Sequence, residues 1–215
     1  MGRSWNLSEG ILSLRAIIVL AGGHSSRFGR DKALMNFGGK PLITQIIERL
    51  RDLGDECVVS IGRIRAVEDY RRVLPKDTLI LQDSVGFQGP LAGFITALNG
   101  CKSNFCFLGA CDMPFIEPTV VEYLFNESVN YSGAVPKWSD GRLEPLHAVY
   151  DCNAARLATQ QVTGEQVLNM ISLIDHIPRI RFVSVEQEIC PLDSTLKTFR
   201  NLNTPRDLDE AKGFL

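Results

Sequence analysis

The sequence lacks the patterns that mark several common classes of protein. None of its six cysteines forms a C-x-x-C pair and its three histidines are scattered, which argues against a structural zinc site or a disulfide framework. No apolar run approaches the roughly 18 to 20 residues that are needed to span a bilayer. The formal net charge is only −2, so no broad basic surface is available for nucleic acid. We expect a cytoplasmic protein with reduced, buried thiols and with neither a nucleic-acid nor a membrane partner.

Two familiar phosphate-binding loops are also absent. A Walker loop needs Gly, four residues and then Gly-Lys-Ser/Thr, and the dinucleotide fingerprint needs G-x-G-x-x-G. Neither spacing occurs in the sequence. The apolar residues 16–20, rich in β-branched side chains, are instead followed by LAGGHSSRFGRDK at residues 20–32. This stretch reads as the loop that leaves the first strand of an α/β unit, which is where open sheets bind ligands.

The chemistry of that loop suits a polyphosphate. Its glycines let the backbone approach a ligand closely and turn N–H groups toward it. Arg27 and Lys32 add fixed positive charge, which phosphate oxygens accept. The apolar residues 11–20 have some of the character of a signal peptide, but Arg15 interrupts them and the loop follows directly. We therefore expect a tail over residues 1–15 and a single domain over residues 16–215.

Strands and helices alternate through the next hundred residues, which predicts a mostly parallel sheet with right-handed crossovers. The expected elements are a helix opened by Pro41 and running to Leu50, a strand at 57–61, a helix at 66–74, a strand at 78–82, a helix at 89–98, a strand at 104–109 and a helix opened by Pro118. Residues 36–41 read as a short turn into the first of these helices.

An acidic residue follows each of the last two of these strands. Asp83 comes directly after residues 78–82, and the helix that begins with GPLAG at 89–93 turns its first N–H groups toward the same edge. Asp112 follows residues 104–109, opposite the phosphate loop, where a bound triphosphate needs a Mg²⁺ ligand. The alternative is that Asp83 caps a helix or turn and that Asp112 is a helix N-cap or a structural carboxylate.

The second half is less regular. Strands at 133–136 and 145–150, joined through a loop at 138–142, predict a small antiparallel part. Residues 153–175 read as helices and residues 181–185 as a further strand. Near the end, Asn201 and Asn203 alternate along an expected strand and so face the same side, while Thr204 caps a helix begun by Pro205.

These motifs resemble those of the molybdenum cofactor guanylyltransferase family (molybdopterin-guanine dinucleotide biosynthesis protein A). Members carry L-A-G-G-x-S-x-R-M-G-x-D-K, then D-x-x-x-x-x-G-P-L-A-G, C-D-x-P, x-x-P-x-x-A-x-Y and N-x-N-T-P-x-D/E-L. The present chain matches them over almost its whole length after the first fifteen residues. It departs from the pattern at Phe28, where Met is usual, and at Ser60, where relatives often have Asn.

The resemblance implies an α/β fold, a three-layer α/β/α sandwich of Rossmann-like nucleotidyltransferase type with a mostly parallel sheet and a small antiparallel part. It also implies Mg²⁺-dependent transfer of GMP from GTP to molybdopterin, and transient contact with other cofactor-biosynthesis proteins. Two alternatives remain, because fold does not define chemistry. One is a cytidylyltransferase or sugar-phosphate nucleotidyltransferase of the same fold, and the other is a non-catalytic nucleotide-binding regulator.

The resemblance assigns roles to individual residues as well. Catalytic roles fall to Arg27, Lys32 and Asp112, and Asp112 would hold Mg²⁺. GTP would contact Leu20, Ala21, Gly22, Gly23, Lys32, Ser60, Asp83 and Asp112. The acceptor would contact Glu144, His147, Asn201 and Asn203, although His147 alone reads as a positioned histidine rather than a general base.

No covalent protein nucleophile is expected, since the terminal phosphate of the acceptor attacks the α-phosphorus directly. Ser25 and Ser26 therefore have no such role. Gly22 bears on the choice of base. Relatives that use cytidine or uridine tend to show Ala-Ala-Gly at this turn, so the bare backbone at Gly22 implies the guanine-using branch.

Overall fold

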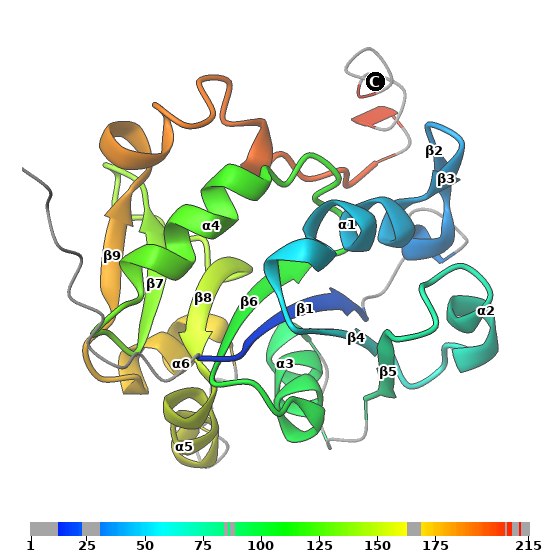
Figure 1. Cartoon of the computed structure of the whole chain (residues 1–215), viewed down its shortest axis with the longest axis horizontal. Coiled ribbons are helices and arrows are strands. Elements are labelled where there is room, and N and C mark those ends of the chain that lie inside the picture. The colour runs from blue at the N-terminus through cyan, green and yellow to red at the C-terminus, as the bar shows by residue number, and fades with distance from the viewer. Residues whose placement is uncertain are drawn as a thin grey trace, which may run out of the picture.

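Seven short apolar segments pair into one central sheet in the computed structural model of the chain (Figure 1). The strands are β1 (Arg15–Ala21), β4 (Glu56–Ile61), β5 (Leu79–Gln82), β6 (Phe105–Ala110), β7 (Gly133–Lys137), β8 (His147–Asp151) and β9 (Arg181–Ser184). Their order across the sheet is β5-β4-β1-β6-β8-β7-β9. The structure describes residues 13–22, 31–83, 86, 89–162, 169–204, 206–207 and 211.

The strand directions decide where the loops emerge. β1 runs parallel to β4 on one side and to β6 on the other, and β4 runs parallel to β5. β8 is antiparallel to both of its neighbours, β6 and β7, while β7 and β9 are parallel. The chain leaves β1 toward β4 first and reaches β6 later, so the strand order reverses at β1. Open α/β sheets bind ligands at such a point.

Helices cover both faces of the sheet, which gives three layers (Figure 1). They are α1 (Leu42–Leu50), α2 (Val67–Arg71), α3 (Pro90–Gly100), α4 (Pro118–Glu127), α5 (Cys152–Val162) and α6 (Met170–His176). Alternate residues of β1 point to opposite layers: Ile17 and Val19 pack with α1 and α4, whereas Ile18 and Leu20 pack with α3 and α5. A strand covered on both faces is apolar throughout. The predicted α/β sandwich with a mostly parallel sheet is confirmed.

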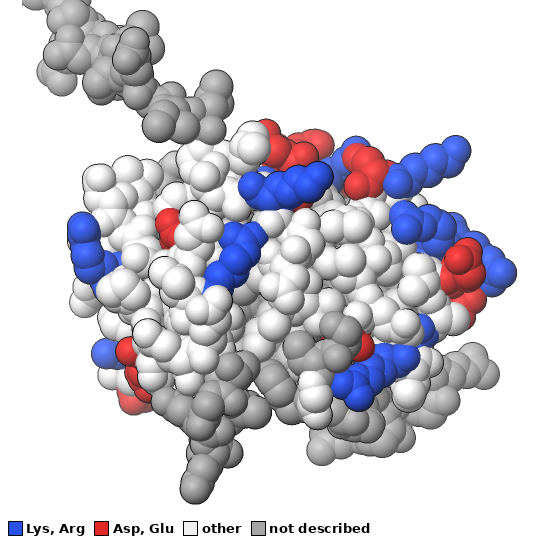
Figure 2. Space-filling model, turned by 90° about the horizontal axis from the view of Figure 1, so that it is seen from below, with Lys and Arg blue, Asp and Glu red and all other residues white. Residues whose placement is uncertain are grey.

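The layer of α3, α5 and α6 carries little charge. Figure 2 views the molecule from this side, and most of the atoms that it shows belong to uncharged residues. Helix α3 contains no charged residue at all, and α5 contains only Arg156. The Arg156 guanidinium donates to the carbonyl of Leu98 at 2.8 Å and to that of Cys101 at 2.6 Å. This charge therefore satisfies carbonyls at the end of α3, which have no partner within the helix.

Some local expectations are wrong. Residues 36–41 form a small hairpin of β2 (Asn36–Phe37) and β3 (Lys40–Pro41) rather than a simple turn. Residues 201–203 form no strand, and a 3-10 turn, η4 (Lys197–Phe199), precedes them instead. The first strand begins at Arg15, one residue earlier than expected, and most of the expected tail lies outside the described residues. Within the part of the chain that the structure covers, no helix is long and apolar enough to cross a membrane.

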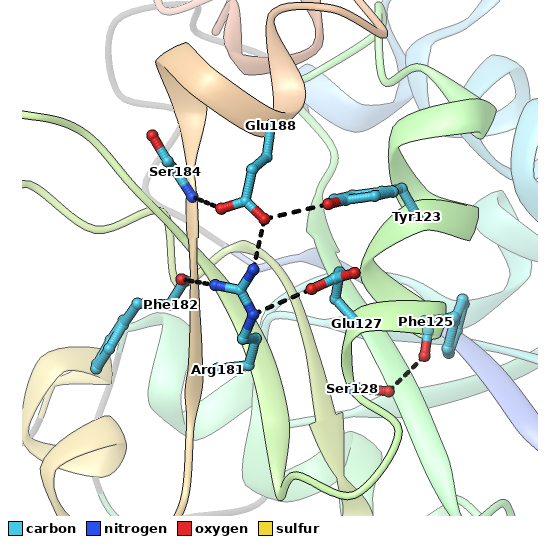
Figure 3. Close-up of polar contacts among 8 residues, drawn as sticks. All are labelled: Tyr123, Phe125, Glu127, Ser128, Arg181, Phe182, Ser184 and Glu188. Carbon is cyan, nitrogen blue, oxygen red and sulfur yellow. Dashed lines mark hydrogen bonds and ion pairs between the residues drawn. The ribbon is translucent and has the colours of Figure 1, made fainter.

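The edge strand β9 is fastened to α4 by a polar cluster around Arg181 (Figure 3). The Arg181 guanidinium donates to Glu127 at 3.0 Å and to Glu188 at 2.5 Å. Glu188 lies in the turn η3 (Val185–Ile189), and it also accepts from the Ser184 N–H at 2.8 Å and the Tyr123 hydroxyl at 3.1 Å. Burial acts to raise the pKa of Glu188, but these donors outweigh it and the net pKa lies below the ordinary value. The cluster therefore stabilises an ionised carboxylate.

This lowered pKa predicts a pH dependence of stability. As the pH falls below 4.5, the ordinary value for Glu, the unfolded chain takes up a proton at Glu188 while the folded chain does not, so stability is lost until the folded-state pKa is passed. We expect Glu188→Gln to reduce the slope of unfolding free energy against pH in this acidic range, as measured by chemical denaturation. Gln187→Ala, which changes an exposed uncharged neighbour, should keep the wild-type slope. An unchanged slope in Glu188→Gln would contradict the assignment.

Candidate active site

The carboxyl ends of β1, β4 and β5 meet so closely at Gly22 that a side chain there would force its neighbours to shift. A Cβ on Gly22 would lie 3.0 Å from Asp83 Oδ2 and 3.1 Å from the backbone nitrogen of Gly62. The preceding residues Leu20 and Ala21 are 5% and 4% exposed. Their side chains belong to the core, so only their backbone can be offered to a ligand at this edge.

Asp83 is held beside Gly22 by a buried serine. The Ser60 hydroxyl, at the end of β4, donates to Asp83 Oδ1 at 2.5 Å, and the Asp83 N–H donates to the carbonyl of Ile61 at 2.9 Å. Burial raises the pKa of Asp83, and the hydrogen bond from Ser60 opposes that rise. Helix α3 approaches the same place through Gly93, where a Cβ would stand 3.4 Å from Ser60 Oγ. The structure thus brings together Gly22, Ser60 and Asp83, as expected from the sequence.

A lysine and a carboxylate meet at the next strand end. Lys32 begins the 3-10 turn η1 (Lys32–Leu34), and its Nζ lies 3.1 Å from Asp112 Oδ2 and 3.3 Å from Asn203 Oδ1. Asp112 follows β6, whose extension is fixed to β1 by the Cys111 N–H donating to the carbonyl of Leu20 at 2.9 Å. The side chains of Lys32 and Asp112 are only 12% and 26% exposed, respectively. Lys32, Asp112 and Asn203, which are far apart in the sequence, therefore form one polar cluster.

The segment 197–204 crosses this edge and reaches the antiparallel part of the sheet. The Leu202 N–H donates to the Asp112 carbonyl at 2.8 Å, and the side chain of Leu202 is fully buried. Phe199 packs its ring 4.8 Å from that of His147 and 5.6 Å from that of Trp138. Core packing and a backbone hydrogen bond thus place Asn203 beside Lys32. The strand expected at residues 201–203 is not needed for this and does not form.

His147 does not face a ligand. Its side chain is completely buried, with Nε2 3.2 Å from the Thr198 hydroxyl and the ring packed between Phe107 and Phe199. Burial lowers the pKa of His147 to about 3, with Asp193 acting in the opposite sense. The imidazole is therefore neutral near pH 7. The expectation that His147 contacts the acceptor is corrected here, because core residues cover it on both faces.

The other expected acceptor residues have different surroundings. Glu144 accepts from the indole N–H of Trp138 at 2.7 Å, and the Arg142 guanidinium stacks on that indole at 4.5 Å. Asn201 is exposed. Thr204 makes the predicted capping contact, since its hydroxyl accepts from the backbone N–H of Asp207 at 3.2 Å. Two expected site residues, Gly23 and Arg27, lie outside the described residues.

The residues that hold Asp31, the neighbour of Lys32, were not predicted from the sequence. Asp31 Oδ2 accepts from the Tyr70 hydroxyl at 2.9 Å and lies 3.3 Å from Arg65 Nε. Tyr70 belongs to α2 and is completely buried. Asp31 precedes Lys32 in the glycine-rich motif, which was the one available signal. Nothing in the sequence points to a tyrosine 39 positions later as its partner.

The donor set at Asp112 fits a metal only in one way. No group of three or more His, Cys, Asp or Glu side chains able to hold a metal ion occurs among residues that the structure describes. Mg²⁺ in phosphoryl-transfer sites is bound through one or two carboxylates together with substrate phosphates. A lone, half-buried carboxylate beside a lysine suits a Mg²⁺ that arrives with a nucleotide, and it does not suit a free-ion site.

The chain is similar to known proteins over most of its length. A family model described as the MobA-like NTP transferase domain matches residues 17–176. A probable molybdenum cofactor guanylyltransferase of Methanosarcina acetivorans is 33% identical over 219 residues, which cover 99% of this chain and 96% of that protein. The crystal structure of molybdopterin-guanine dinucleotide biosynthesis protein A from Archaeoglobus fulgidus has a TM-score of 0.76 and 25% identity over 93% of this chain and 97% of that one.

The fold is shared more widely. The crystal structure of 2-C-methyl-D-erythritol 4-phosphate cytidylyltransferase from Thermus thermophilus has a TM-score of 0.67 at 17% identity, and it covers 94% of this chain and 98% of that one. At this identity the likeness concerns the fold alone.

The opposing effects on Asp83 yield a direct test of the site's electrostatics. In Ser60→Ala, burial is no longer opposed by the serine hydrogen bond, so the pKa of Asp83 should rise further above its ordinary value of 3.8. The titration of the Asp83 carboxyl carbon by NMR measures this rise. The control is Thr96→Val on α3, since the buried Thr96 hydroxyl has no hydrogen-bond partner among the described residues. A pKa that falls or stays constant in Ser60→Ala would refute the hydrogen bond's role.

Proposed function

The chain belongs to the MobA-like NTP transferase family and is a nucleotidyltransferase, and we propose that it transfers GMP from GTP to molybdopterin. The products are molybdopterin guanine dinucleotide and pyrophosphate. The observation that carries this proposal is the pairing of Lys32 with Asp112 at 3.1 Å at the carboxyl edge of the sheet. The 33% identity to a protein named probable molybdenum cofactor guanylyltransferase supports the choice of substrates.

The proposed reaction needs no protein nucleophile. An oxygen of the terminal phosphate of molybdopterin forms a bond to the α-phosphorus of GTP, and the bond from that phosphorus to the bridging oxygen breaks as pyrophosphate leaves with the electron pair. Lys32 supplies an ammonium that neutralises phosphate charge as it shifts toward the leaving group. Asp112 would hold Mg²⁺, which neutralises the same charge when it is bound.

The Lys32–Asp112 pair also explains how the site stays intact before the nucleotide binds. Two charged groups this little exposed would each be costly without a partner, and here each neutralises the other. The lysine stem is flexible, so its ammonium can turn from the carboxylate to a phosphate. The carboxylate is then released for the metal that accompanies the nucleotide.

Recognition of guanine is assigned to the edge formed by Gly22, Ser60 and Asp83. Guanine carries the N1–H and an exocyclic amine as donors, and a carboxylate is an acceptor-only group that matches them. Asp83 is kept in a defined orientation by Ser60, and the backbone at Gly22 is bare. A site with buried polar groups rejects a base that leaves those groups unpaired. On the acceptor side we retain Asn203, Asn201 and Glu144 and omit the buried His147.

The choice of base can be measured by thermal unfolding. We expect Mg-GTP to raise the unfolding temperature of the wild-type protein more than Mg-CTP does, because only the bound folded state gains from the ligand. Gly22→Ala should narrow that difference at a cost to GTP binding of about 1 to 3 kcal/mol, since its Cβ would lie 3.0 Å from Asp83 Oδ2.

Gly62→Ala is the matched control, because a Cβ there meets nothing closer than the Cα of Gly22 at 3.6 Å. It should keep the preference of the wild type. Equal stabilisation of the wild type by the two nucleotides would contradict the guanine assignment and favour the cytidylyltransferase alternative.

The roles of Lys32 and Asp112 can be separated by calorimetric titration of GTP with Mg²⁺ and with a chelator. Asp112→Asn should abolish the gain in affinity that Mg²⁺ brings, because the amide lacks the charge that the ion requires. Lys32→Ala should weaken binding in both conditions, by roughly 1.5 to 3 kcal/mol, the usual contribution of a hydrogen bond to a charged group. Asp140→Asn, in an exposed loop, is the control. If Mg²⁺ still raises the affinity for GTP in Asp112→Asn, the assignment of Asp112 as the Mg²⁺ ligand is wrong.

A further inference from the structure

Asp31 uses both of its carboxylate oxygens inside the protein. Oδ1 accepts from the Ala33 N–H at 3.2 Å and so caps η1, the turn that carries Lys32. Oδ2 accepts from the Tyr70 hydroxyl at 2.9 Å and lies 3.3 Å from Arg65 Nε. A cap requires only one oxygen. The second oxygen ties the turn to the segment around α2, which is remote in the sequence.

Tyr70 is a rigid anchor for that second oxygen. Its ring is completely buried in the same core cluster as β1 and α1. Its hydroxyl lies 3.4 Å from the carbonyl of Ala21, at the end of β1, and closer to Asp31. Burial, followed by the charge of Asp31, raises the pKa of Tyr70. The hydroxyl therefore stays protonated and can donate a hydrogen bond to Asp31. A hydrogen bond to an ionised carboxylate is stronger than one between two neutral groups.

The arrangement also compensates a charge that would otherwise attract Lys32. Asp31 adjoins Lys32, and an uncompensated carboxylate there would compete with Asp112 for the ammonium. Arg65 and Tyr70 compensate that carboxylate, with side chains of Asp31 and Arg65 only 14% and 18% exposed. Asp31 therefore does not draw the Lys32 ammonium away from Asp112, which lies 3.1 Å from it.

We propose that Asp31, clamped by Tyr70 and Arg65, is a positioning residue that sets the direction of Lys32 toward the phosphates. The inference rests on the proposed function for its ligand, but the clamp itself is a property of the free protein. Asp31 acts only through Lys32. Weakening the clamp should therefore matter only while Lys32 is present.

A double-mutant cycle tests this dependence. Tyr70→Phe deletes one hydroxyl and should weaken Mg-GTP binding about five- to twentyfold in the wild-type background, which is part of the roughly 10- to 150-fold effect of a lost hydrogen bond to a charged group, because Tyr70 acts on the ligand only indirectly. In the Lys32→Ala background the same change should cost less than about twofold, since coupled residues are non-additive. Equal losses in the two backgrounds would overturn the proposal, because they would indicate a merely structural effect of Tyr70.

Tyr123→Phe is the matched control. Its hydroxyl also donates to a carboxylate, that of Glu188 at 3.1 Å, but this pair belongs to the cluster around Arg181 between α4 and β9 (Figure 3). This variant should bind Mg-GTP as the wild type does. Thermal unfolding of all variants confirms that each is folded at the temperature of the titration.

A second measurement needs no nucleotide and so separates this inference from the proposed function. The Lys32 ammonium, held beside Asp112, should give a ¹⁵N-resolved NMR signal, assigned by its loss in Lys32→Ala. The signal should broaden or vanish in Tyr70→Phe and persist in Tyr123→Phe. If GTP fails to bind but the signal responds in this way, the proposed function fails and the positioning role stands. A signal unaffected by Tyr70→Phe would refute the positioning role whichever nucleotide binds.

Discussion

Parallel pairing on both sides of β1 is the constraint from which the site follows. Because β4 and β6 run parallel to β1, the loops that leave all three strands must emerge at one edge of the sheet. The strand ends approach so closely that a Cβ at position 22 would stand 3.0 Å from Asp83 Oδ2 and would require that side chain to shift. Asp112, one strand further, is fixed by hydrogen bonds from Cys111 to β1 and from Leu202 to its own carbonyl. Backbone pairing, more than loop chemistry, brings these groups together.

Charge at this edge is arranged in compensated pairs. Lys32 neutralises Asp112, and Arg65 neutralises Asp31, whose carboxylate also accepts a hydrogen bond from Tyr70. In the Lys32–Asp112 pair, phosphate and metal can take the place of each residue's partner. The contacts of Asp31 lie between the turn η1 and the buried ring of Tyr70. Stable compensation of Asp31 leaves Asp112 as the carboxylate beside Lys32 that can respond to the phosphates and their metal. This division explains how two acidic residues near a phosphate site can coexist with phosphate binding.

The sequence predicted the parts of the molecule that depend on local pattern. Apolar runs bounded by glycine and proline indicated the strands of the first half and their parallel arrangement, and the position of Lys32, Asp83 and Asp112 after those strands indicated a shared edge. The rest depended on packing between distant segments. His147 was expected to contact the acceptor, but the rings of Phe107 and Phe199 cover it in the structure. Asn203 reaches Lys32 although its expected strand does not form, because the buried Leu202 fixes the segment.

Release of pyrophosphate tests the central claim most directly. Each of the four nucleoside triphosphates is incubated with Mg²⁺ and the protein, with and without molybdopterin, and the nucleotide product is identified by mass. The proposed function requires pyrophosphate to appear with GTP only when molybdopterin is present, together with molybdopterin guanine dinucleotide. Release with CTP in preference to GTP, or no release with any nucleotide, would contradict guanylyl transfer by the Lys32 and Asp112 edge.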